Sequence, residues 1–221
     1  MAMMIGPRPI RTLEDLPRTV PIFPLTGALL LPRGALPLNV FEPRYLAMVD
    51  SALSGDRLIG MIQPTENEEH NLRPPLSDVG CLGRLVSFTE GDDRRYHITL
   101  KGLCRFRVAQ ELSVDTPYRQ VVPDYSNFLG DLVQHEDSEF PRDRVIAALK
   151  HYLSRRDLKA DWQAVMNAPA ETLVNALSML CPFEPAEKQA LLEAPGWDER
   201  VATLVALLEM AGAEPTSGTV N

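Results

Sequence analysis

Prolines set among apolar residues between Val20 and Leu53 constrain the fold of this chain more than any other feature. The stretch opens with Val-Pro-Ile-Phe-Pro-Leu and continues with Leu-Pro-Arg-Gly from residue 31 and Leu-Pro-Leu-Asn-Val from residue 36. Because a proline cannot donate a hydrogen bond to a neighbouring strand, it is tolerated mainly at strand starts, edges and bulges. The stretch therefore predicts short, bent strands.

The end of the same stretch predicts a helix that begins at Pro43. Proline is accepted at the first helical position because its missing N–H would have no partner inside the helix. The apolar side chains that follow recur at helical spacing and form one face: Tyr45, Leu46, Val49 and Leu53. We therefore expect strand, loop, strand and helix in this order.

Alternating and continuous apolar runs predict further strands in the first half of the chain. These strands are expected at 57–63, 79–89, 96–108 and 118–122. Gly80 and Gly83 indicate a bulge or a sharp bend, and Gly102 is expected to break the third of these strands. The polar residues 64–77 predict a long connecting loop. About six short strands with one helix favour a small, bent β-barrel over a sandwich, and a single intervening helix argues against parallel β–α–β winding.

In the second half, the spacing of apolar residues becomes that of helices. The expected apolar faces are Val145, Ile146, Leu149, Tyr152 and Leu153; Trp162, Val165 and Met166; Leu173, Leu177 and Leu180; and Val201, Leu204, Val205 and Leu208. Pro182 and Pro195 are expected to end helices. The predicted fold is therefore α+β, with a flexible tail at 1–19, a barrel at 20–125, a polar linker at 126–138, a helical bundle at 139–213 and a second tail at 214–221.

The net charge of −8 is unevenly distributed along the chain. Residues 1–125 hold 14 Lys+Arg against 15 Asp+Glu, whereas residues 126–221 hold 8 against 15. An acidic surface opposes nucleic-acid binding, whose affinity comes largely from neutralised phosphates. Nucleic acid is therefore a disfavoured partner, although a local basic strip in the first half is left open.

The lack of a recognisable targeting signal and the small number of cysteines both favour the cytoplasm. No apolar run approaches the length of a membrane span, and the N-terminal residues lack the apolar core of a secretory signal. Cys81, Cys104 and Cys181 are too few and too far apart for a disulfide framework or a zinc site. Cys104 alternates with apolar neighbours and is expected to pack in the core. We therefore expect a cytoplasmic protein with reduced thiols.

Motifs that would indicate an enzyme are missing from the sequence. It has no phosphate-binding G-x-x-x-x-G-K-[ST] loop, no H-E-x-x-H metal motif and no G-x-S-x-G nucleophile elbow. The four histidines are scattered, and the neighbouring carboxylates Asp92 and Asp93 lie in a polar turn. We therefore predict no catalytic residues, no cofactor and no metal.

Several of these segments together resemble the N-terminal substrate-binding domain of the Lon proteases. The resemblance rests on the proline-rich start at 21–25, the Leu-Pro-x-Gly turn, the Phe41-Glu42-x-Arg44-Tyr45 segment and the Gly-x-x-Arg-Phe entry at 102–106. The helical segment 187–193 and Arg200 with its following leucines are similar to the closing helices of that domain. Arg33 departs from the family pattern, because it spaces the usual Leu-Pro-Gly by one residue.

The resemblance implies a PUA-like β-barrel followed by a helical bundle, and a non-catalytic module that binds peptides or proteins. The chain looks like a freestanding domain of this type, found in bacteria apart from the protease, since neither the ATPase nor the Ser-Lys peptidase domain of Lon is recognised in the sequence. Unfolded or degron-bearing polypeptides are the implied clients, either held or delivered to a protease. The alternative is RNA binding, because other PUA-like barrels bind RNA.

Candidate binding residues come from two places in the first half of the chain. At the expected helix start they are Phe41, Glu42, Arg44 and Tyr45; on the strands they are Arg105 and Arg107, which could form a basic strip with Arg94 and Arg95. A structural role is the alternative for the first group. In that role Glu42 caps the helix, where a negative charge contributes about 0.3–1 kcal/mol, Arg44 pairs with an acid and Tyr45 packs.

Overall fold

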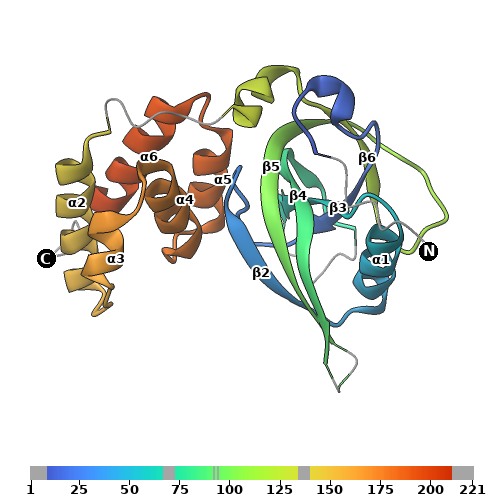
Figure 1. Cartoon of the computed structure of the whole chain (residues 1–221), viewed down its shortest axis with the longest axis horizontal. Helices are drawn as coiled ribbons and strands as arrows, with labels where there is room; N and C mark the ends of the chain where they lie inside the picture. Colours follow the sequence, from blue (N-terminus) through green and yellow to red (C-terminus); the bar gives the residue numbers. More distant parts are fainter. Residues whose placement is uncertain (1–8, 67–72, 92, 94, 134–139, 211–221) are drawn as a thin grey trace, which may run out of the picture.

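The computed structural model describes residues 9–66, 73–91, 93, 95–133 and 140–210 (Figure 1). A closed sheet with one covering helix forms one half, and a group of helices forms the other half beside it (Figure 1). The predicted α+β class is confirmed. The predicted tail at 214–221 lies outside the described residues.

Six strands form one sheet in the order β2-β5-β4-β3-β1-β6. They are β1 (Val20–Pro24), β2 (Ala35–Val40), β3 (Leu58–Pro64), β4 (Leu76–Glu90), β5 (Tyr96–Glu111) and β6 (Gln120–Asp124). The sheet closes on itself because β6 pairs with both β1 and β5. The β1–β3 pair is parallel, and the other pairs are antiparallel.

The prolines of the first strands lie where their chemistry predicts. Pro24 is the last residue of β1, and Pro37 lies in β2 at the edge of the sheet, opposite Thr99 of β5. An edge position leaves one side of the strand without a neighbour, so the missing N–H costs no ladder hydrogen bond. The prediction of short strands in this stretch is confirmed.

Gly102 does not break β5, contrary to the prediction from the sequence. The strand runs continuously through it, and the register with β4 shifts between Leu82 and Gly83. A side chain at Gly102 would overlap the carbonyl oxygen of Leu31. The glycine therefore lets the segment before β2 approach the strand, where its carbonyl accepts a hydrogen bond from Arg33 N–H at 2.8 Å.

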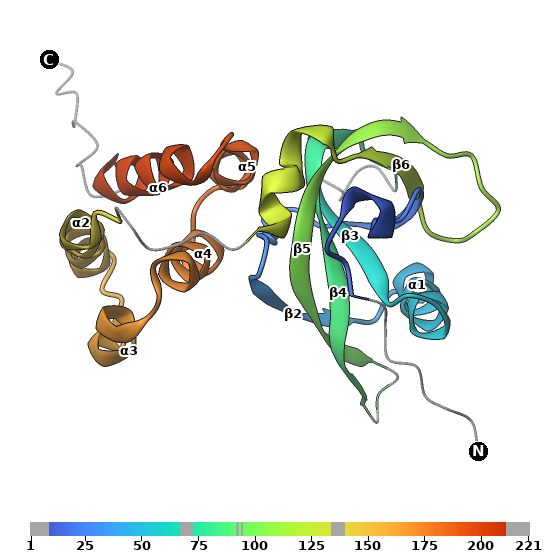
Figure 2. The ribbon, with the colours of Figure 1, turned by 45° about the horizontal axis from the view of Figure 1, so that its top comes forward.

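Helix α1 (Pro43–Ser54) packs on the sheet through the face that its spacing predicts. Tyr45, Met48, Val49 and Ala52 are buried, and the Tyr45 ring lies 4.1 Å from that of Phe23 in β1. The helix lies on the side of the sheet away from the other helices (Figure 2). It therefore joins the core of the sheet half.

Two short 3₁₀-helices replace segments predicted to be flexible or polar connections. Leu13–Asp15 forms η1, Leu16 is buried, and the Tyr125 hydroxyl donates to the Pro17 carbonyl at 3.3 Å. The prediction of little fixed structure before Val20 is therefore wrong for these residues. In the predicted linker, Ser126–Leu132 forms η3 and buries Phe128 and Asp131.

The helical half consists of α2 (Arg142–Arg155), α3 (Trp162–Asn167), α4 (Ala170–Leu180), α5 (Pro185–Glu193) and α6 (Trp197–Met210). Helix α6 packs against α2, α4 and α5. The predicted apolar face of α2 is buried completely, whereas Leu180 of α4 is 80% exposed. The helices end before Pro182 and Pro195, as predicted.

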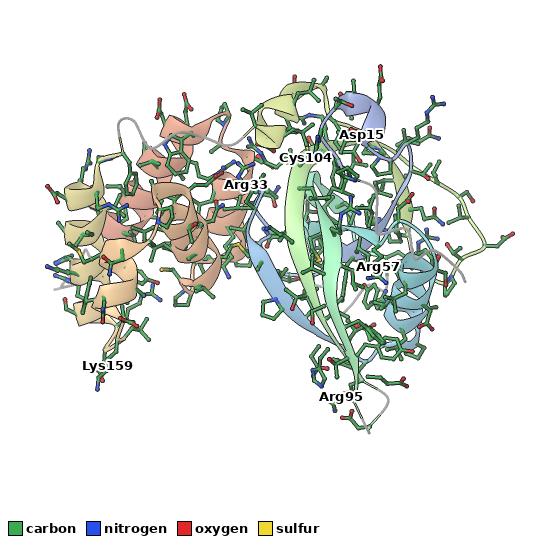
Figure 3. All side chains as sticks on the ribbon, in the orientation of Figure 1. Asp15, Arg33, Arg57, Arg95, Cys104 and Lys159 are labelled. Atoms are coloured by element: carbon green, nitrogen blue, oxygen red, sulfur yellow. The ribbon has the colours of Figure 1, made fainter. Side chains whose placement is uncertain are left out.

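Arg105 joins the two halves and is not part of an exposed basic strip, contrary to the prediction. It is buried and contacts both carboxylate oxygens of Asp131 at 2.9 Å. It also donates to the carbonyl of Leu192, in the last turn of α5, at 3.0 Å. Arg33, between the sheet and the helices in Figure 3, forms an ion pair with Glu171 of α4. Charged groups therefore fix the junction.

Candidate functional site

A hollow of about 440 Å³ lies beside the start of α1, and we call it the α1 hollow. The end of β1, the start of α1 and the loop between β5 and β6 surround it. Its lining consists of Pro24, Glu42, Pro43, Arg44, Tyr45, Arg73, Val114, Thr116, Pro117, Tyr118 and Arg119. Helix α1 and the β5–β6 loop lie on the side of the sheet away from the helical half (Figures 1 and 2).

The α1 side of the hollow is held together by one ion pair and one aromatic stack. Arg44 Nε donates to Glu42 Oε2 at 2.9 Å, and the Arg44 guanidinium lies 4.4 Å from the centroid of the Tyr45 ring. Tyr45 is buried against Phe23, and its hydroxyl donates to the Pro24 carbonyl at 3.5 Å. The wall of the hollow is thereby fixed to the core.

Glu42 occupies the N-cap position of α1 but does not cap the helix with its side chain. Within the described structure around this turn, its carboxylate accepts no capping hydrogen bond. The carboxylate pairs with Arg44 instead. The alternative structural role thus holds for the pairing of Arg44 and the packing of Tyr45, but the predicted side-chain cap is wrong.

The opposite wall of the hollow carries a network centred on Glu111. Arg119 donates to both carboxylate oxygens of Glu111 at 2.8 and 2.7 Å, and Arg73 donates to the same group at 3.1 Å. The hydrogen bond from Arg119 lowers the pKa of Glu111 below its ordinary value. The third guanidinium nitrogen of Arg119, Nη1, donates to the Pro74 carbonyl at 2.7 Å. Arg119 therefore ties the β5–β6 loop to the segment before β4.

The combination of charged pairs and apolar walls suits binding rather than chemistry. Val114, Pro117 and Tyr118 supply apolar surface, and the charged groups around them are already paired. A smaller hollow of about 350 Å³ continues past Arg73 and Arg119. A bound segment could therefore extend beyond the α1 hollow along the same loop.

The cysteines lie apart from this site and pack in the core. All three are free and buried, as predicted for Cys104. Burial raises the pKa of the Cys104 thiol to about 12 and that of the Cys181 thiol to about 11. Such thiols stay protonated at neutral pH and are poor nucleophiles. Within the described ranges, no group of three or more His, Cys, Asp or Glu side chains could hold a metal ion.

The other predicted binding residues are scattered. Phe41 is 60% exposed between β2 and α1, outside the lining of the hollow, with the Arg95 guanidinium 5.6 Å from its ring centroid. Arg107 is exposed and pairs with Asp78 at 3.1 Å. Arg94 lies outside the described residues. Because Arg105 is buried and Arg107 is paired, the hypothesis of a continuous basic strip across these strands is wrong.

Half of the α1 hollow was not predicted from the sequence. Tyr118 was assigned to a strand, but β6 begins at Gln120, which leaves Tyr118 free to line the hollow. The loop reaches α1 because β6 pairs with β1 and so carries residues 112–119 back to the first strand. The Thr116-Pro117 pair, a turn signal between two strands, was the local sign of this loop.

The family model of the ATP-dependent protease La (LON) substrate-binding domain matches residues 19–210. The chain belongs to this family. The match spans both halves of the structure, from the start of β1 to the end of α6. The resemblance found in the proline-rich start and the closing helices is thereby confirmed.

Curated relatives with this domain are Lon proteases. The Lon protease of Dictyoglomus thermophilum is 30% identical over 206 residues, which cover 88% of this chain and 24% of that protein. The Lon protease of Desulfosudis oleivorans is 33% identical over 109 residues, or 48% of this chain and 13% of that protein. The chain thus spans about a quarter or less of the length of these relatives.

Solved structures share the fold of this LON substrate-binding domain. A Lon N-terminal domain protein from Xanthomonas campestris gives a TM-score of 0.57 at 23% identity and covers 85% of this chain and 97% of that one. The N-terminal domain of a Mycobacterium avium complex Lon protease gives 0.57 at 17% identity, with 86% and 97% covered. At these identities the likeness shows the fold alone. In the described part of the chain, no helix is both long and apolar enough to cross a bilayer.

Proposed function

We propose that this LON substrate-binding domain is a non-catalytic module that binds unfolded or degron-bearing polypeptides in the α1 hollow. The observation that carries the proposal is the lining of the hollow, where exposed apolar side chains of the β5–β6 loop lie beside paired charges of α1. The family match supports a substrate-binding role. Such a module acts in the cytoplasm, holding clients or handing them to a protease.

The proposed architecture is a PUA-like β-barrel over residues 20–125 followed by a helical bundle over 139–213. The pairing of β6 with both β1 and β5 supports the barrel, because it joins the two ends of a five-strand run. The helix–helix packing around α6 supports the bundle. In this arrangement the hollow lies on the barrel.

The chemistry of the hollow fits a short unfolded segment. Such a segment exposes apolar side chains and unpaired backbone groups that are buried in a folded protein. Val114, Pro117 and Tyr118 offer apolar contacts to the side chains of such a segment. Binding therefore depends on an apolar residue that the client exposes.

Titration calorimetry with a permanently unfolded, reduced and alkylated protein fragment tests this proposal. Val114→Ser and Tyr118→Ser remove apolar surface from a loop and are expected to weaken binding about fivefold or more each, as central apolar contacts do. Val86→Ser is the matched control, because Val86 is 52% exposed on β4 and is not part of the lining.

Two outcomes would contradict the proposal. One is that the folded wild-type domain, verified by circular dichroism, binds no unfolded fragment at high micromolar concentration. The other is that Val114→Ser and Tyr118→Ser bind as tightly as Val86→Ser. The second result would retain polypeptide binding but remove it from the α1 hollow.

A further inference from the structure

A second groove, with an apolar lining, runs between α2, α3 and α4 on the helical half. Its volume is about 530 Å³, within the range typical of binding sites. We call it the helix groove. Leucines of α2, of the loop after it and of α4 are the most frequent lining residues: Leu149, Leu153, Leu158, Leu173, Leu177 and Leu180. It shares no residue with the α1 hollow.

Large apolar side chains remain in contact with solvent around the helix groove. Leu180 is 80% exposed and Leu158 is 43% exposed, and both line the groove. On α3, Met166 is 54% exposed and Trp162 is 37% exposed. The sequence assigned three of these residues to packed helix faces, so the local pattern is that of a buried surface. Exposed apolar side chains beside an apolar groove are typical of an interaction surface.

The same part of the molecule concentrates positive charge on an otherwise acidic half. Four of the eight cations between Ser126 and Asn221 fall within residues 150–159. Lys159 lines the helix groove, and Figure 3 shows it projecting beyond the helices at the end of this half. The Arg156 guanidinium lies 5.0 Å from the ring centroid of Tyr152, a lining residue, and Lys150 Nζ lies 5.5 Å from that of Trp162.

These cations are not neutralised within the described structure. None of the ion pairs found among the described residues uses Lys150, Arg156 or Lys159. Asp157, the one acid within residues 150–159, is exposed, and the nearby Asp161 accepts a hydrogen bond from Ala164 N–H as the N-cap of α3. Donors therefore outnumber acceptors at this surface.

The shape of the groove selects a helix over an extended peptide. Its walls are mainly side chains of three helices, whose backbone N–H and C=O groups are largely paired within the helices. An extended segment would bury backbone groups without partners, whereas a helix satisfies its own. Amphipathic helices bind such grooves through apolar residues at positions i, i+3, i+4 and i+7.

We propose that the helix groove binds an acidic amphipathic helix of a partner protein. The apolar face of that helix would cover Leu158 and Leu180, and its flanking carboxylates would pair with Lys159, Arg156 and Lys150. The partner is therefore a folded or folding helix with glutamates or aspartates beside a leucine-rich stripe. This site is separate from the α1 hollow and holds whether or not that hollow binds unfolded polypeptides.

Fluorescence anisotropy with two designed peptides tests the proposal on the full chain. Both are amphipathic helices of about 15 residues, near the length at which isolated helices become stable, with the same leucine stripe. One carries glutamates on the flanks and the other lysines. The glutamate peptide is expected to bind at least about tenfold more tightly than the lysine peptide at low salt, and this preference should shrink as salt rises.

Matched substitutions locate the binding. Leu180→Gln is expected to weaken binding of the glutamate peptide about tenfold. Leu13→Gln, at a leucine of η1 that is 51% exposed, should have no effect on this binding. Lys159→Glu is expected to weaken binding of this peptide about threefold to tenfold, and Lys101→Glu, at an exposed lysine of β5, should leave it unchanged. Because the substituted side chains are exposed, these variants should remain folded.

Three results would overturn the proposal. Equal affinity for the two peptides would remove the charge preference, and unchanged binding by Leu180→Gln would place the peptide elsewhere. Concentration-dependent dimerisation that Leu180→Gln abolishes, without peptide binding, would assign the groove to a second copy of the chain. Val114→Ser should bind the glutamate peptide normally, so a failure at the α1 hollow is distinguishable from a failure here.

Discussion

The α1 hollow and the helix groove differ in whether their charged side chains have partners of opposite charge. In the α1 hollow, Arg44 pairs with Glu42, and Arg73 and Arg119 pair with Glu111. In the helix groove, Lys159, Arg156 and Lys150 have no carboxylate partner among the described residues, and the lining is mainly apolar. A site with internally paired charges gains little from the charge of a ligand, whereas unpaired cations beside apolar walls select an acidic one.

The contrast depends on the junction that keeps the two surfaces on opposite ends of the molecule. Asp131→Asn removes the negative charge that Arg105 contacts while both groups are buried. Because one buried charge is then left uncompensated, we expect a loss of about 3–5 kcal/mol in the free energy of unfolding. Urea denaturation followed by circular dichroism measures it.

Asp78→Asn is the control for this largest effect, since it breaks an Arg–Asp pair of the same chemistry that is exposed on the sheet. It should cost less than about 1 kcal/mol. Equal losses for the two variants would show that burial of the Arg105–Asp131 pair does not set the strength of the junction.

Arg119→Ala is expected to have an intermediate effect on stability and to weaken binding at the α1 hollow but not at the helix groove. The substitution removes the hydrogen bonds that tie the β5–β6 loop to Glu111 and to the Pro74 carbonyl. We expect a loss of about 1–3 kcal/mol in stability and weaker binding of unfolded fragments. Binding of the glutamate peptide in the helix groove should be unchanged, and calorimetry on both ligands checks this.

Arg107→Ala provides the comparison for that variant, because the Arg107 side chain is exposed and pairs across the sheet surface with Asp78. This substitution should change the binding of neither the unfolded fragment nor the glutamate peptide. If Arg119→Ala weakened both ligands equally, the two surfaces would not be independent.

The smallest expected effect is a pH dependence that belongs to the α1 hollow. The folded-state pKa of Glu111 lies below its ordinary value of 4.5 because Arg119 donates to it. The corresponding stability is therefore present above the unfolded-state pKa and is lost as the pH falls through the folded-state pKa. Since the Glu111 side chain is 32% exposed, solvent screens the ion pair, and the contribution should stay below about 1 kcal/mol.

Unfolding free energies measured between neutral pH and acid test this contribution. The stability of Glu111→Gln should fall less steeply in acid than that of the wild type, because the titrating group is gone. A variant profile parallel to that of the wild type would show that Glu111 has no lowered pKa.

The helices and strands could be predicted because they depend on local chemistry. The sites could not, because they depend on contacts between residues far apart in the sequence. Pro43 and Pro182 indicated helix boundaries from sequence alone, because a proline acts on its own turn. The burial of Arg105 could not be predicted, because it depends on Asp131 in η3 and on carbonyls at 192 and 194. A single arginine in an alternating strand carries no local sign of such partners.

The two surfaces show the same limit. Glu42, Arg44 and Tyr45 were singled out together and do line one hollow, but its other wall arrives only because β6 returns to β1. At the helix groove, the apolar periodicity of Leu180 predicted burial, yet no described element covers it. Periodicity shows which face is apolar, but not whether the fold supplies a partner for that face.

The closure of the sheet also sets an order for folding on the ribosome. Val20 of β1 pairs with Val121 of β6, so the first strand acquires its second neighbour only after about one hundred further residues have been synthesised. Until then β1 has an unpaired edge, and unpaired edges promote aggregation. The helical half, whose contacts are more local, can form quickly once it emerges. A nascent chain that stalls before Gln120 therefore exposes an open sheet, the kind of unfinished polypeptide that cellular quality control removes.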